Sequence, residues 1–240
     1  MYIPSHLEVT ELDQQVELIR EYPLGTMFSY NGGKSRLLDY FKSGKEDDAI
    51  DSEMCATHVP FCYVSGSTET GPGKLIAHLA RRNQHVELLE QSPNCLVVFQ
   101  SVDSYVSPEY YPLKKKTHKF VPTWDFGCVH VYGRARIIRD DPAWLLEMLN
   151  AITDQEEEKR PDEANRWKVS EAEPSYLERM MKEVVGIEIE ISSVQCKMKF
   201  QQDQPPVNVN GVLDGYSKEL DAAKAQELSK FTRKHYPRDL

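Results

Sequence analysis

The chain of 240 residues is 40% hydrophobic and 28% charged, which is typical of a globular protein. Its formal net charge of −9 disfavours nonspecific nucleic-acid binding, which depends on lysine and arginine neutralising phosphates. No apolar run approaches the roughly 20 residues that span a bilayer, and the first residues show no secretory signal. Five scattered cysteines without a C-x-x-C pair favour reduced thiols over disulfides or a zinc site. We therefore expect a cytoplasmic or nuclear protein.

The first predicted elements alternate between helix and strand. A near capping box at 10–13 begins a helix that Pro23 ends. A strand is predicted at 24–30, and a loop insertion, rich in glycine, serine and charge, at 31–53. The next stretch, MCATHVPFCYV, alternates as a strand that places on one face Cys55, Thr57, Val59, Phe61 and Tyr63. A glycine-rich turn then joins it to the strand KLIAHLA, as in a hairpin.

The remainder of the chain continues this mixed pattern. Asp141 and Pro142 are a good helix start, because aspartate caps helices and proline fits their first position. The other elements expected are helix 83–91, strand 95–102, an aromatic loop, strand 127–138, helix 144–153, charged linker 154–163, helix 173–185, strand 186–200, a proline-rich connector 201–211 and a last helix around Leu220, Ala223, Leu228 and Phe231. Antiparallel hairpins with interleaved helices predict an α+β, mainly β fold, an antiparallel β-barrel with peripheral helices.

A cluster of hydrogen-bond donors follows the strand KLIAHLA: Arg81, Arg82 and Asn83. The sequence has no G-x-G-x-x-G or P-loop motif, so side chains would have to hold any phosphate, and Arg81 with Asn83 are the obvious donors. Neither G-x-S-x-G nor H-E-x-x-H is present. Each strand histidine lies without a partner at ligand spacing, which favours interior or cofactor-side histidines over metal ligands: His58, His78 and His130. The lysine-rich stretch 113–119 is interpreted as a solvated loop.

Several stretches together resemble the PaiB family of negative transcriptional regulators, whose fold is the FMN-binding split barrel shared with pyridoxamine-phosphate oxidases. The matching stretches are MYIPSHLEV, ATHVPF, HLARRN, VVFQSVDSYVSPEYYP, VPTWDF, VHVYGRAR, VVGIEIEI and KMKF. In order and spacing they cover most of residues 1–200. The resemblance implies an FMN-binding domain at 1–205, followed by a connector and C-terminal helix at 206–240.

The resemblance also implies a homodimer that binds FMN in a groove at the subunit interface. The ATHVPF strand would border the ring or ribityl chain, Arg81 and Asn83 would lie near the phosphate, and the partner's KMKF strand would reach the site. The cofactor-binding residues implied are Ala56, Thr57, His58, His78, Ala80, Arg81, Asn83, Gln100, Trp124, Lys197 and Lys199. Other interpretations stay open: Arg81 paired with an acidic neighbour, Trp124 in the core and Lys199 facing solvent. No catalytic residue is assigned.

Two departures from the family pattern bear on the site. The sequence KFQQDQ replaces the family's usual continuation of the C-terminal strand, so polar groups near the flavin there differ. The insertion at 31–53 is longer than the bacterial pattern, which indicates a fungal member and could cover the site.

Three functions fit the resemblance. The first is an FMN-dependent oxidoreductase for an unidentified small molecule. The second is a flavin-binding regulator without catalysis of its own, with no direct nucleic-acid binding expected. The third is a haem-binding or haem-degrading split barrel, with His118 or His235 as the candidate iron ligand. A flavin absorption spectrum supports the first two, and a Soret band supports the third.

The net charge gives a first prediction. Binding to random-sequence duplex DNA at physiological salt should be undetectable below micromolar protein concentrations, because such affinity rests on phosphate neutralisation. Fluorescence anisotropy of a labelled duplex measures it. A tight, steeply salt-dependent complex would contradict the prediction and favour the regulator.

Overall fold

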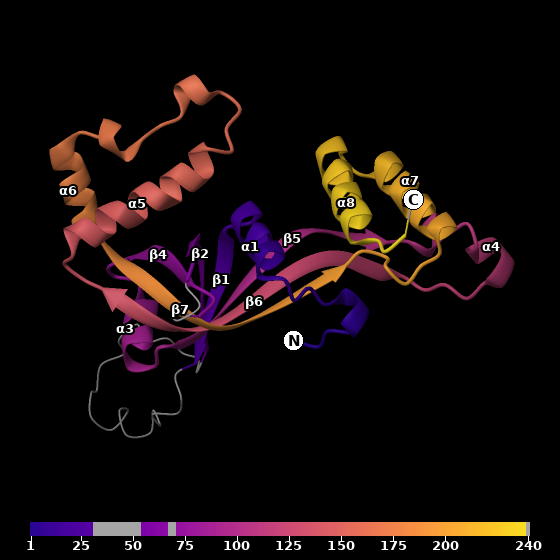
Figure 1. Cartoon of the computed structure of the whole chain (residues 1–240), viewed down its shortest axis with the longest axis horizontal. Helices are drawn as coiled ribbons and strands as arrows, with labels where there is room; N and C mark the ends of the chain where they lie inside the picture. The colour runs from indigo at the N-terminus through magenta and orange to yellow at the C-terminus, as the bar shows by residue number, and fades with distance from the viewer. Residues whose placement is uncertain (31–53, 67–70, 239–240) are drawn as a thin grey trace, which may run out of the picture. The chain divides into compact units, whose positions relative to one another are not determined.

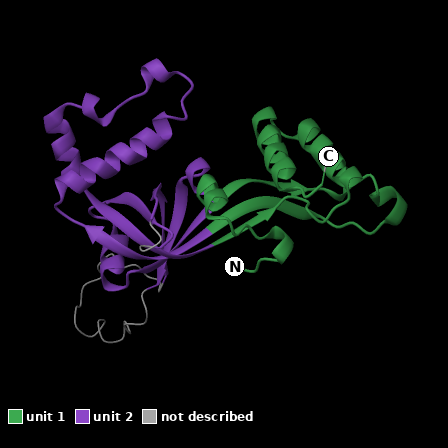
Figure 2. Ribbon diagram, viewed as in Figure 1, with its two compact units in different colours: residues 1–18, 100–129, 195–240 green, residues 19–99, 130–194 purple. Residues whose placement is uncertain are grey.

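The computed structural model describes residues 1–30, 54–66 and 71–238, so the predicted insertion at 31–53 lies outside the described residues. Two compact units are distinguished in Figure 2. Unit 1 comprises 1–18, 100–129 and 195–240, and unit 2 comprises 19–99 and 130–194. Unit 1 contains the C-terminal segment together with two earlier parts of the chain, and the domain boundary expected at residue 205 stays a prediction. Within these described ranges no helix is both long and apolar enough to cross a membrane.

The described strands form one sheet in the order β2-β1-β5-β6-β7-β4-β3 (Figure 1). Pairs β1–β2, β1–β5, β3–β4 and β4–β7 are all antiparallel. The strands are β1 (Leu24–Tyr30), β2 (Met54–Pro60), β3 (Cys62–Val64), β4 (Lys74–Ala80), β5 (Asn94–Val106), β6 (Thr123–Ile138) and β7 (Val184–Lys199). The predicted antiparallel split β-barrel with peripheral helices is confirmed.

The described helices lie before, between and after these strands along the chain (Figure 1). They are α1 (Leu12–Glu21), α3 (Gln84–Gln91), α4 (Lys114–Thr117), α5 (Pro142–Glu157), α6 (Pro174–Lys182), α7 (Pro206–Glu219) and α8 (Ala222–His235), with 3₁₀ turns at Ser5–Leu7, Pro108–Tyr110, Glu163–Asn165 and Val169–Glu171. The helix predicted at 83–91 is confirmed as α3, and the lysine-rich stretch predicted as a loop contains the single helical turn of α4.

Alternating burial in unit 2 follows the predicted strand faces. The single strand expected over 54–64 is divided: β2 pairs with β1 at one edge of the sheet, and β3 pairs with β4 at the other edge. Only the short β3 therefore takes part in the expected hairpin. On the face predicted to carry them, Val59, Phe61 and Tyr63 are buried. Gly25 of β1 packs against Phe61 and Val97. A Cβ atom at this position would be 2.7 Å from Val97 Cγ1 and 3.1 Å from Phe61 Cδ2. Close packing of that kind leaves no room for a methyl group. The sheet face therefore requires glycine at this position.

Helix α5 covers the face of β4 that carries Ile76. Asp141 caps it by accepting a hydrogen bond from the Trp144 backbone N–H, at 3.0 Å, and Pro142 occupies the first turn as predicted. Its Leu145 and Met148 form a buried cluster with Ile76 of β4. Burial of such side chains contributes roughly 1.5–3 kcal/mol each, so this cluster fixes α5 on the sheet.

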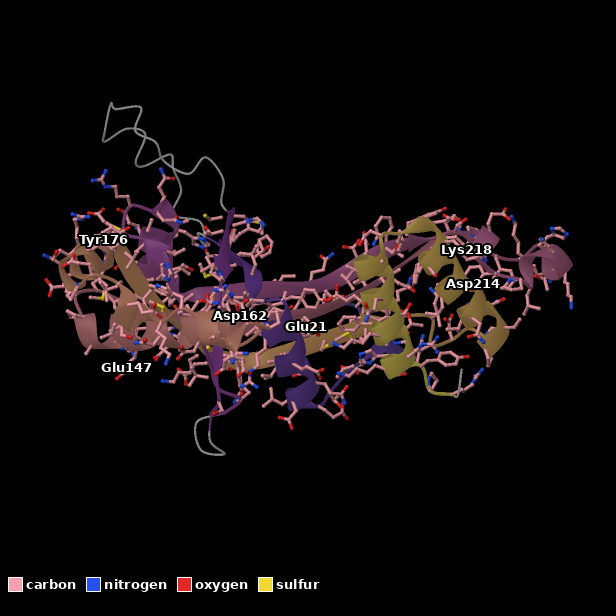
Figure 3. The ribbon with its side chains drawn as sticks, turned by 90° about the horizontal axis from the view of Figure 1, so that it is seen from above. Glu21, Glu147, Asp162, Tyr176, Asp214 and Lys218 are labelled. Carbon is pink, nitrogen blue, oxygen red and sulfur yellow. The ribbon has the colours of Figure 1, made fainter. Side chains whose placement is uncertain are left out.

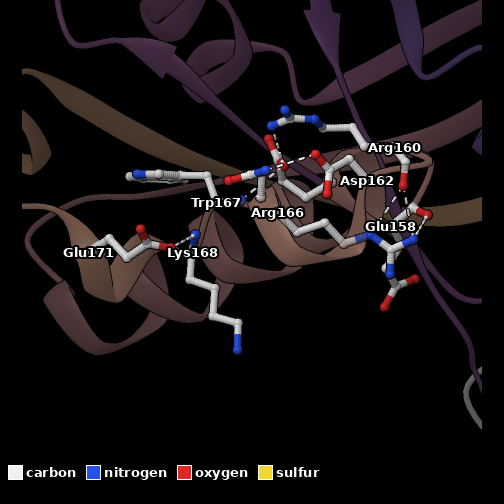
Figure 4. Close-up of polar contacts among 9 residues, drawn as sticks. Glu158, Arg160, Asp162, Arg166, Trp167, Lys168 and Glu171 are labelled. Atoms are coloured by element: carbon white, nitrogen blue, oxygen red, sulfur yellow. Dashed lines mark hydrogen bonds and ion pairs between the residues drawn. The ribbon is translucent and has the colours of Figure 1, made fainter.

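The expected charged linker at 154–163 is ordered by polar contacts (Figure 4). Helix α5 continues to Glu157, and Arg166 then folds back to donate to the Glu158 and Arg160 carbonyl oxygens at 2.9 and 3.0 Å. The Trp167 backbone N–H donates to the Glu157 carboxylate at 3.0 Å. These bonds satisfy carbonyl groups that a helix end would otherwise leave without partners.

The prediction of a connector at 201–211 is wrong in its second half, because helix α7 begins at Pro206. Proline is tolerated in the first helical turn. Gly215, which counts as a helix breaker, lies where a Cβ would be 2.5 Å from the Tyr110 ring. The buried face carries Val209, Val212, Leu213 and Tyr216, while Asp214 and Lys218 form an exposed ion pair at 2.8 Å (Figure 3). Packing against Tyr110 thus outweighs low helix propensity.

Candidate functional site

The residues expected to bind a cofactor fall into two groups, one in each unit. Unit 2 contains those from strand β2, strand β4 and the turn before α3. Unit 1 contains those from β5, β6 and the end of β7.

Strand β2 presents its predicted residues on two faces. Ala56 and His58 are exposed on one face, whereas Thr57 is half-buried on the other. Alternation of side chains along a strand accounts for this separation. The exposed pair is available to a ligand lying on the strand, and Thr57 points toward the face on which α3 packs.

Thr57 is bound there by a histidine outside the predicted set. His85 of α3 is completely buried, with its Nδ1 atom 2.8 Å from Thr57 Oγ1 and its Nε2 atom 2.7 Å from Ser29 Oγ on β1. Burial lowers the pKa of His85, so the ring is neutral at pH 7. Both ring nitrogens have partners, and the imidazole joins three elements.

The turn between β4 and α3 holds the predicted anion donors. Arg81 Nε donates to the Lys182 carbonyl oxygen at 2.8 Å, and its Nη2 atom lies 3.2 Å from the exposed Asp140 carboxylate. Asn83 Oδ1 accepts from the His85 backbone N–H at 2.9 Å and caps α3. The acidic neighbour considered for Arg81 is therefore present, and Asn83 has a structural role. Its amide nitrogen is the atom that an anion would use.

The other two predicted residues of β4 differ in exposure. Ala80 is exposed at the end of the strand. His78 is half-buried on the strand face that carries Ile76, and burial lowers its pKa. Its Nδ1 atom is buried and has no hydrogen-bond partner among the described residues. An orphaned polar atom of this kind calls for a partner that binds it.

In unit 1, two predicted residues, Trp124 and Gln100, contact two residues outside the predicted set, Asp103 and Tyr105. Trp124 Nε1 donates to Asp103 Oδ1 at 2.8 Å, and Gln100 donates to the other carboxylate oxygen at 3.3 Å. The Tyr105 ring meets the Trp124 ring edge-to-face, with centroids 6.1 Å apart. Both rings are nearly half exposed, so the interpretation of Trp124 as a core residue is wrong. They form an ordered aromatic surface.

The two predicted lysines lie on the same face of β7. Lys199 donates to the Trp124 carbonyl oxygen at 2.7 Å and to the Thr123 hydroxyl, and burial lowers its pKa. Lys197 lies 5.5 Å above the Phe126 ring and 6.0 Å from the Tyr2 ring. Lys199 is thus half-buried beside the aromatic surface, and the interpretation of it as a solvent-facing lysine does not hold.

The residue that follows Trp124 on β6 is a buried carboxylate, Asp125. Asp125 is fully buried, with one oxygen 2.5 Å from Gln201 Nε2 and the other 2.7 Å from the Tyr216 hydroxyl. Tyr111 donates to the other side of the Gln201 amide at 2.8 Å. Burial raises the pKa of Asp125 to about 6, although its two donors oppose the shift. This network attaches α7 to the strand that carries Trp124.

The haem hypothesis depended on two histidines. His235 is stacked on Phe231 and Phe200, each with centroids 6.2 Å away, and burial lowers its pKa to about 4. His118 ends α4 in a left-handed conformation with φ of 54°. Neither belongs to a group of three metal-ligating side chains within the part of the chain that the structure describes.

Sequence patterns reveal only part of the role of the residues outside the predicted set. His85 and Leu89 are four residues apart and share the buried face of α3, so helical spacing alone places the imidazole inside. Its partners Ser29 and Thr57 come from other elements, and no local pattern links them. Asp103 and Asp125 likewise have partners from other elements, Trp124 of β6 for Asp103 and Tyr216 of α7 for Asp125.

The donor sets of the two units suit different parts of a flavin nucleotide. Arginine side chains and a helix N-terminus suit an anion. Exposed aromatic rings with a neighbouring lysine and amide suit a planar, polar-edged ring. Unit 1 also has a pocket of about 620 Å³ that includes none of the predicted cofactor-binding residues. It is lined by Pro112, Val207, Asn210, Gly211, Leu213, Asp214, Ser217, Ser229 and Arg233.

Comparison with known proteins agrees with this chemistry. A family model described as "Putative FMN-binding domain" matches residues 1–193. The uncharacterized protein YKL070W of Saccharomyces cerevisiae is 56% identical over 165 residues, which cover 69% of this chain and 95% of that protein. Protease synthase and sporulation protein PAI 2 of Bacillus subtilis is 25% identical over 214 residues, with 89% of this chain and 88% of that protein covered. The resemblance to PaiB is confirmed.

A solved structure extends the comparison to the fold. The FAD and heme binding protein from Mycobacterium smegmatis has a TM-score of 0.50 at 14% identity, over 80% of this chain and 73% of that one. At this identity the likeness concerns the fold alone. It supports the split barrel, and the family match supports FMN as the cofactor.

The buried Asp125 gives a pH prediction. Its folded-state pKa is about 6, against 3.8 for the unperturbed group. The folded chain therefore binds the Asp125 proton more tightly than the unfolded chain does. The contribution of this proton to the free energy of unfolding is fully present below pH 4 and is lost as the pH rises through 6. At roughly 1.4 kcal/mol per pKa unit, the loss is about 3 kcal/mol. The Asp125→Asn variant should lack this part of the pH dependence in urea unfolding measured between pH 4 and 7.5.

The exposed residue Asp214 provides a matched control. Asp214→Asn removes an aspartate paired on the surface of α7 and should keep the wild-type pH dependence. Parallel stability curves for wild type and Asp125→Asn would contradict the assignment of a raised pKa to Asp125.

Proposed function

The chain belongs to the FMN-binding domain family, and from this membership we propose that it is an FMN-dependent oxidoreductase acting on a small molecule. The observation that carries the proposal is the family match over residues 1–193 together with donor groups suited to both ends of FMN. When bound, FMN supplies the electron-transfer chemistry. The chain's residues hold it, orient it and limit access of water.

We assign the phosphate to the turn between β4 and α3. The Arg81 guanidinium is half-exposed and fixed by the Lys182 carbonyl oxygen, so little conformational entropy is lost when an anion binds it. The exposed Arg82 and the Asn83 amide nitrogen add donors beside it. Ala56 and His58, exposed on β2, and Ala80, at the end of β4, would border the rest of the nucleotide.

We further propose a homodimer in which a second copy of the chain completes the site. A flavin ring on one exposed strand needs a second wall to exclude water. The aromatic surface of Trp124 and Tyr105, with Gln100 and the two lysines of β7, offers such a wall. A two-fold interface repeats every contact and would create two equivalent sites.

Catalysis is favoured over a purely regulatory role by the exposed polar groups. His58 and Gln100 offer polar groups that could contact a substrate beside the flavin, which a cofactor with only a structural task would not require. The haem alternative is less favoured, because His235 is enclosed by Phe200 and Phe231. The net charge of −9 also disfavours a direct role on DNA.

The phosphate assignment is tested by comparing FMN with riboflavin. Arg81→Ala should weaken FMN binding at low salt by about 1.5–3 kcal/mol, the range for a charge-assisted hydrogen bond. Riboflavin has no phosphate, so its affinity should be the same in wild type and variant. Quenching of flavin fluorescence measures both affinities.

A neighbouring surface arginine serves as the control. Arg139→Ala removes a cation paired with Glu90 at 2.8 Å in the same unit and should leave FMN affinity within twofold. Unchanged FMN affinity in Arg81→Ala would overturn the phosphate assignment. Equal losses for FMN and riboflavin would do the same, because they would indicate general damage to the fold.

A further inference from the structure

The guanidinium group of Arg81 is held by three oxygen atoms of its own chain. Its Nε atom donates to the Lys182 carbonyl oxygen at 2.8 Å, and its Nη2 atom lies 3.2 Å from Asp140 Oδ1 and 3.4 Å from the Val184 carbonyl oxygen. Among the described residues, no acceptor contacts the Nη1 atom of Arg81. This atom carries two N–H donors, so it is the part of the group that an external anion would use first.

Asp140 is unlike the two carbonyl groups, because it brings a negative charge. It lies in the turn between β6 and α5, with a left-handed φ of 56°, and its side chain is 81% exposed. Residues other than glycine rarely adopt this conformation, and asparagine tolerates it as well as aspartate does. Glycine or asparagine would therefore satisfy the backbone of this turn, and the turn geometry does not account for the carboxylate.

Stability does not account for the carboxylate either. Exposed ion pairs contribute little to the free energy of unfolding, because water screens the two charges. Arg81 is also fixed without Asp140, since its Nε atom donates to the Lys182 carbonyl oxygen and its backbone N–H donates to the Glu183 carbonyl oxygen, each at 2.8 Å. Asp140 thus places a negative charge beside the proposed phosphate donor without a structural need for it.

A carboxylate and a phosphate on one guanidinium group repel each other. A phosphate monoester, such as that of FMN, carries roughly −1.5 to −2 charges at pH 7. Coulomb's law in water gives a factor of about ten in affinity for a dianion and a unit negative charge roughly 6 Å apart. Riboflavin has no phosphate and does not experience this repulsion. The charge of Asp140 therefore acts on the phosphate-bearing flavin alone.

We propose that Asp140 is an internal anion that competes with the phosphate of FMN for Arg81 and so makes the cofactor easier to release. The carboxylate can turn to solvent when a phosphate binds, because its side chain is exposed. Asp140 is then a specificity-determining residue, which lowers the affinity for FMN relative to riboflavin. The inference rests on the proposed phosphate assignment of Arg81 and adds to it a residue outside the set expected from sequence.

Neutral replacement of Asp140 tests the proposal. Asp140→Asn removes the charge and keeps a residue type that tolerates a positive φ. FMN should bind about five- to tenfold more tightly at low salt and dissociate more slowly, whereas riboflavin affinity should stay within twofold. The gain should disappear at roughly 1 M salt, where the screening length is about 3 Å. Flavin fluorescence measures the affinities, and stopped-flow mixing measures the dissociation rate.

A second variant separates charge from hydrogen bonding. The amide of Asp140→Asn can bring a new donor to the phosphate, whereas Asp140→Gly brings no side chain and also suits a positive φ. Both variants should tighten FMN, and tightening by Asp140→Asn alone would overturn the proposal. Glu90→Gln is the matched control, because it removes a carboxylate paired with Arg139 at 2.8 Å in the same unit. It should leave FMN affinity within twofold.

The outcomes separate this inference from the proposed function. Absence of FMN binding by the wild-type protein overturns both. Weaker FMN binding in Asp140→Asn overturns the inference alone, because Asp140 would then position Arg81 for the phosphate. Unchanged FMN affinity in both Asp140 variants, together with a loss in Arg81→Ala, also overturns the inference alone. Unchanged affinity in all three variants overturns the phosphate assignment as well.

Discussion

The imidazole of His85 is the constraint on which the phosphate side of the candidate site depends. It is completely buried, and the hydrogen bonds of its two ring nitrogens join α3 to β1 and β2. Its backbone N–H is capped by Asn83, so the same residue also fixes the start of α3 and the turn that carries Arg81. Satisfied buried polar groups favour one arrangement because each alternative leaves a donor or acceptor without a partner. The position of the turn relative to β2 is thereby specified.

Unit 1 contains a comparable arrangement built on a carboxylate. Asp125 is buried between the Gln201 amide and the Tyr216 hydroxyl, and it directly follows the exposed Trp124 along β6. Trp124 is held on its exposed side by Asp103 and on its backbone by Lys199. Each unit therefore places exposed polar or aromatic side chains next to a buried polar residue that is held by hydrogen bonds. Such support is what a preorganised binding surface requires.

The sequence was sufficient for most strands because apolar alternation is a local property. The strand faces of 54–64, the hairpin of 62–64 with KLIAHLA and the Asp141 cap all follow from neighbouring residues, and the structure has them. Helix α7 was missed because its prolines and glycines are read locally as breakers, whereas Gly215 is required by the Tyr110 ring from another element. His85 was missed for a similar reason, since its partners are 28 and 56 residues away. Contacts between distant elements carry no sequence signal without a relative for comparison.

We propose that each chain holds one FMN and that a second copy of the chain completes the site. Sedimentation of the purified protein with FMN, followed by both flavin absorbance and protein absorbance, tests it most directly. We expect a species of about twice the 27.6 kDa chain mass that carries one FMN per chain. A protein that sediments without flavin at saturating FMN, or a fully loaded monomer, would contradict it.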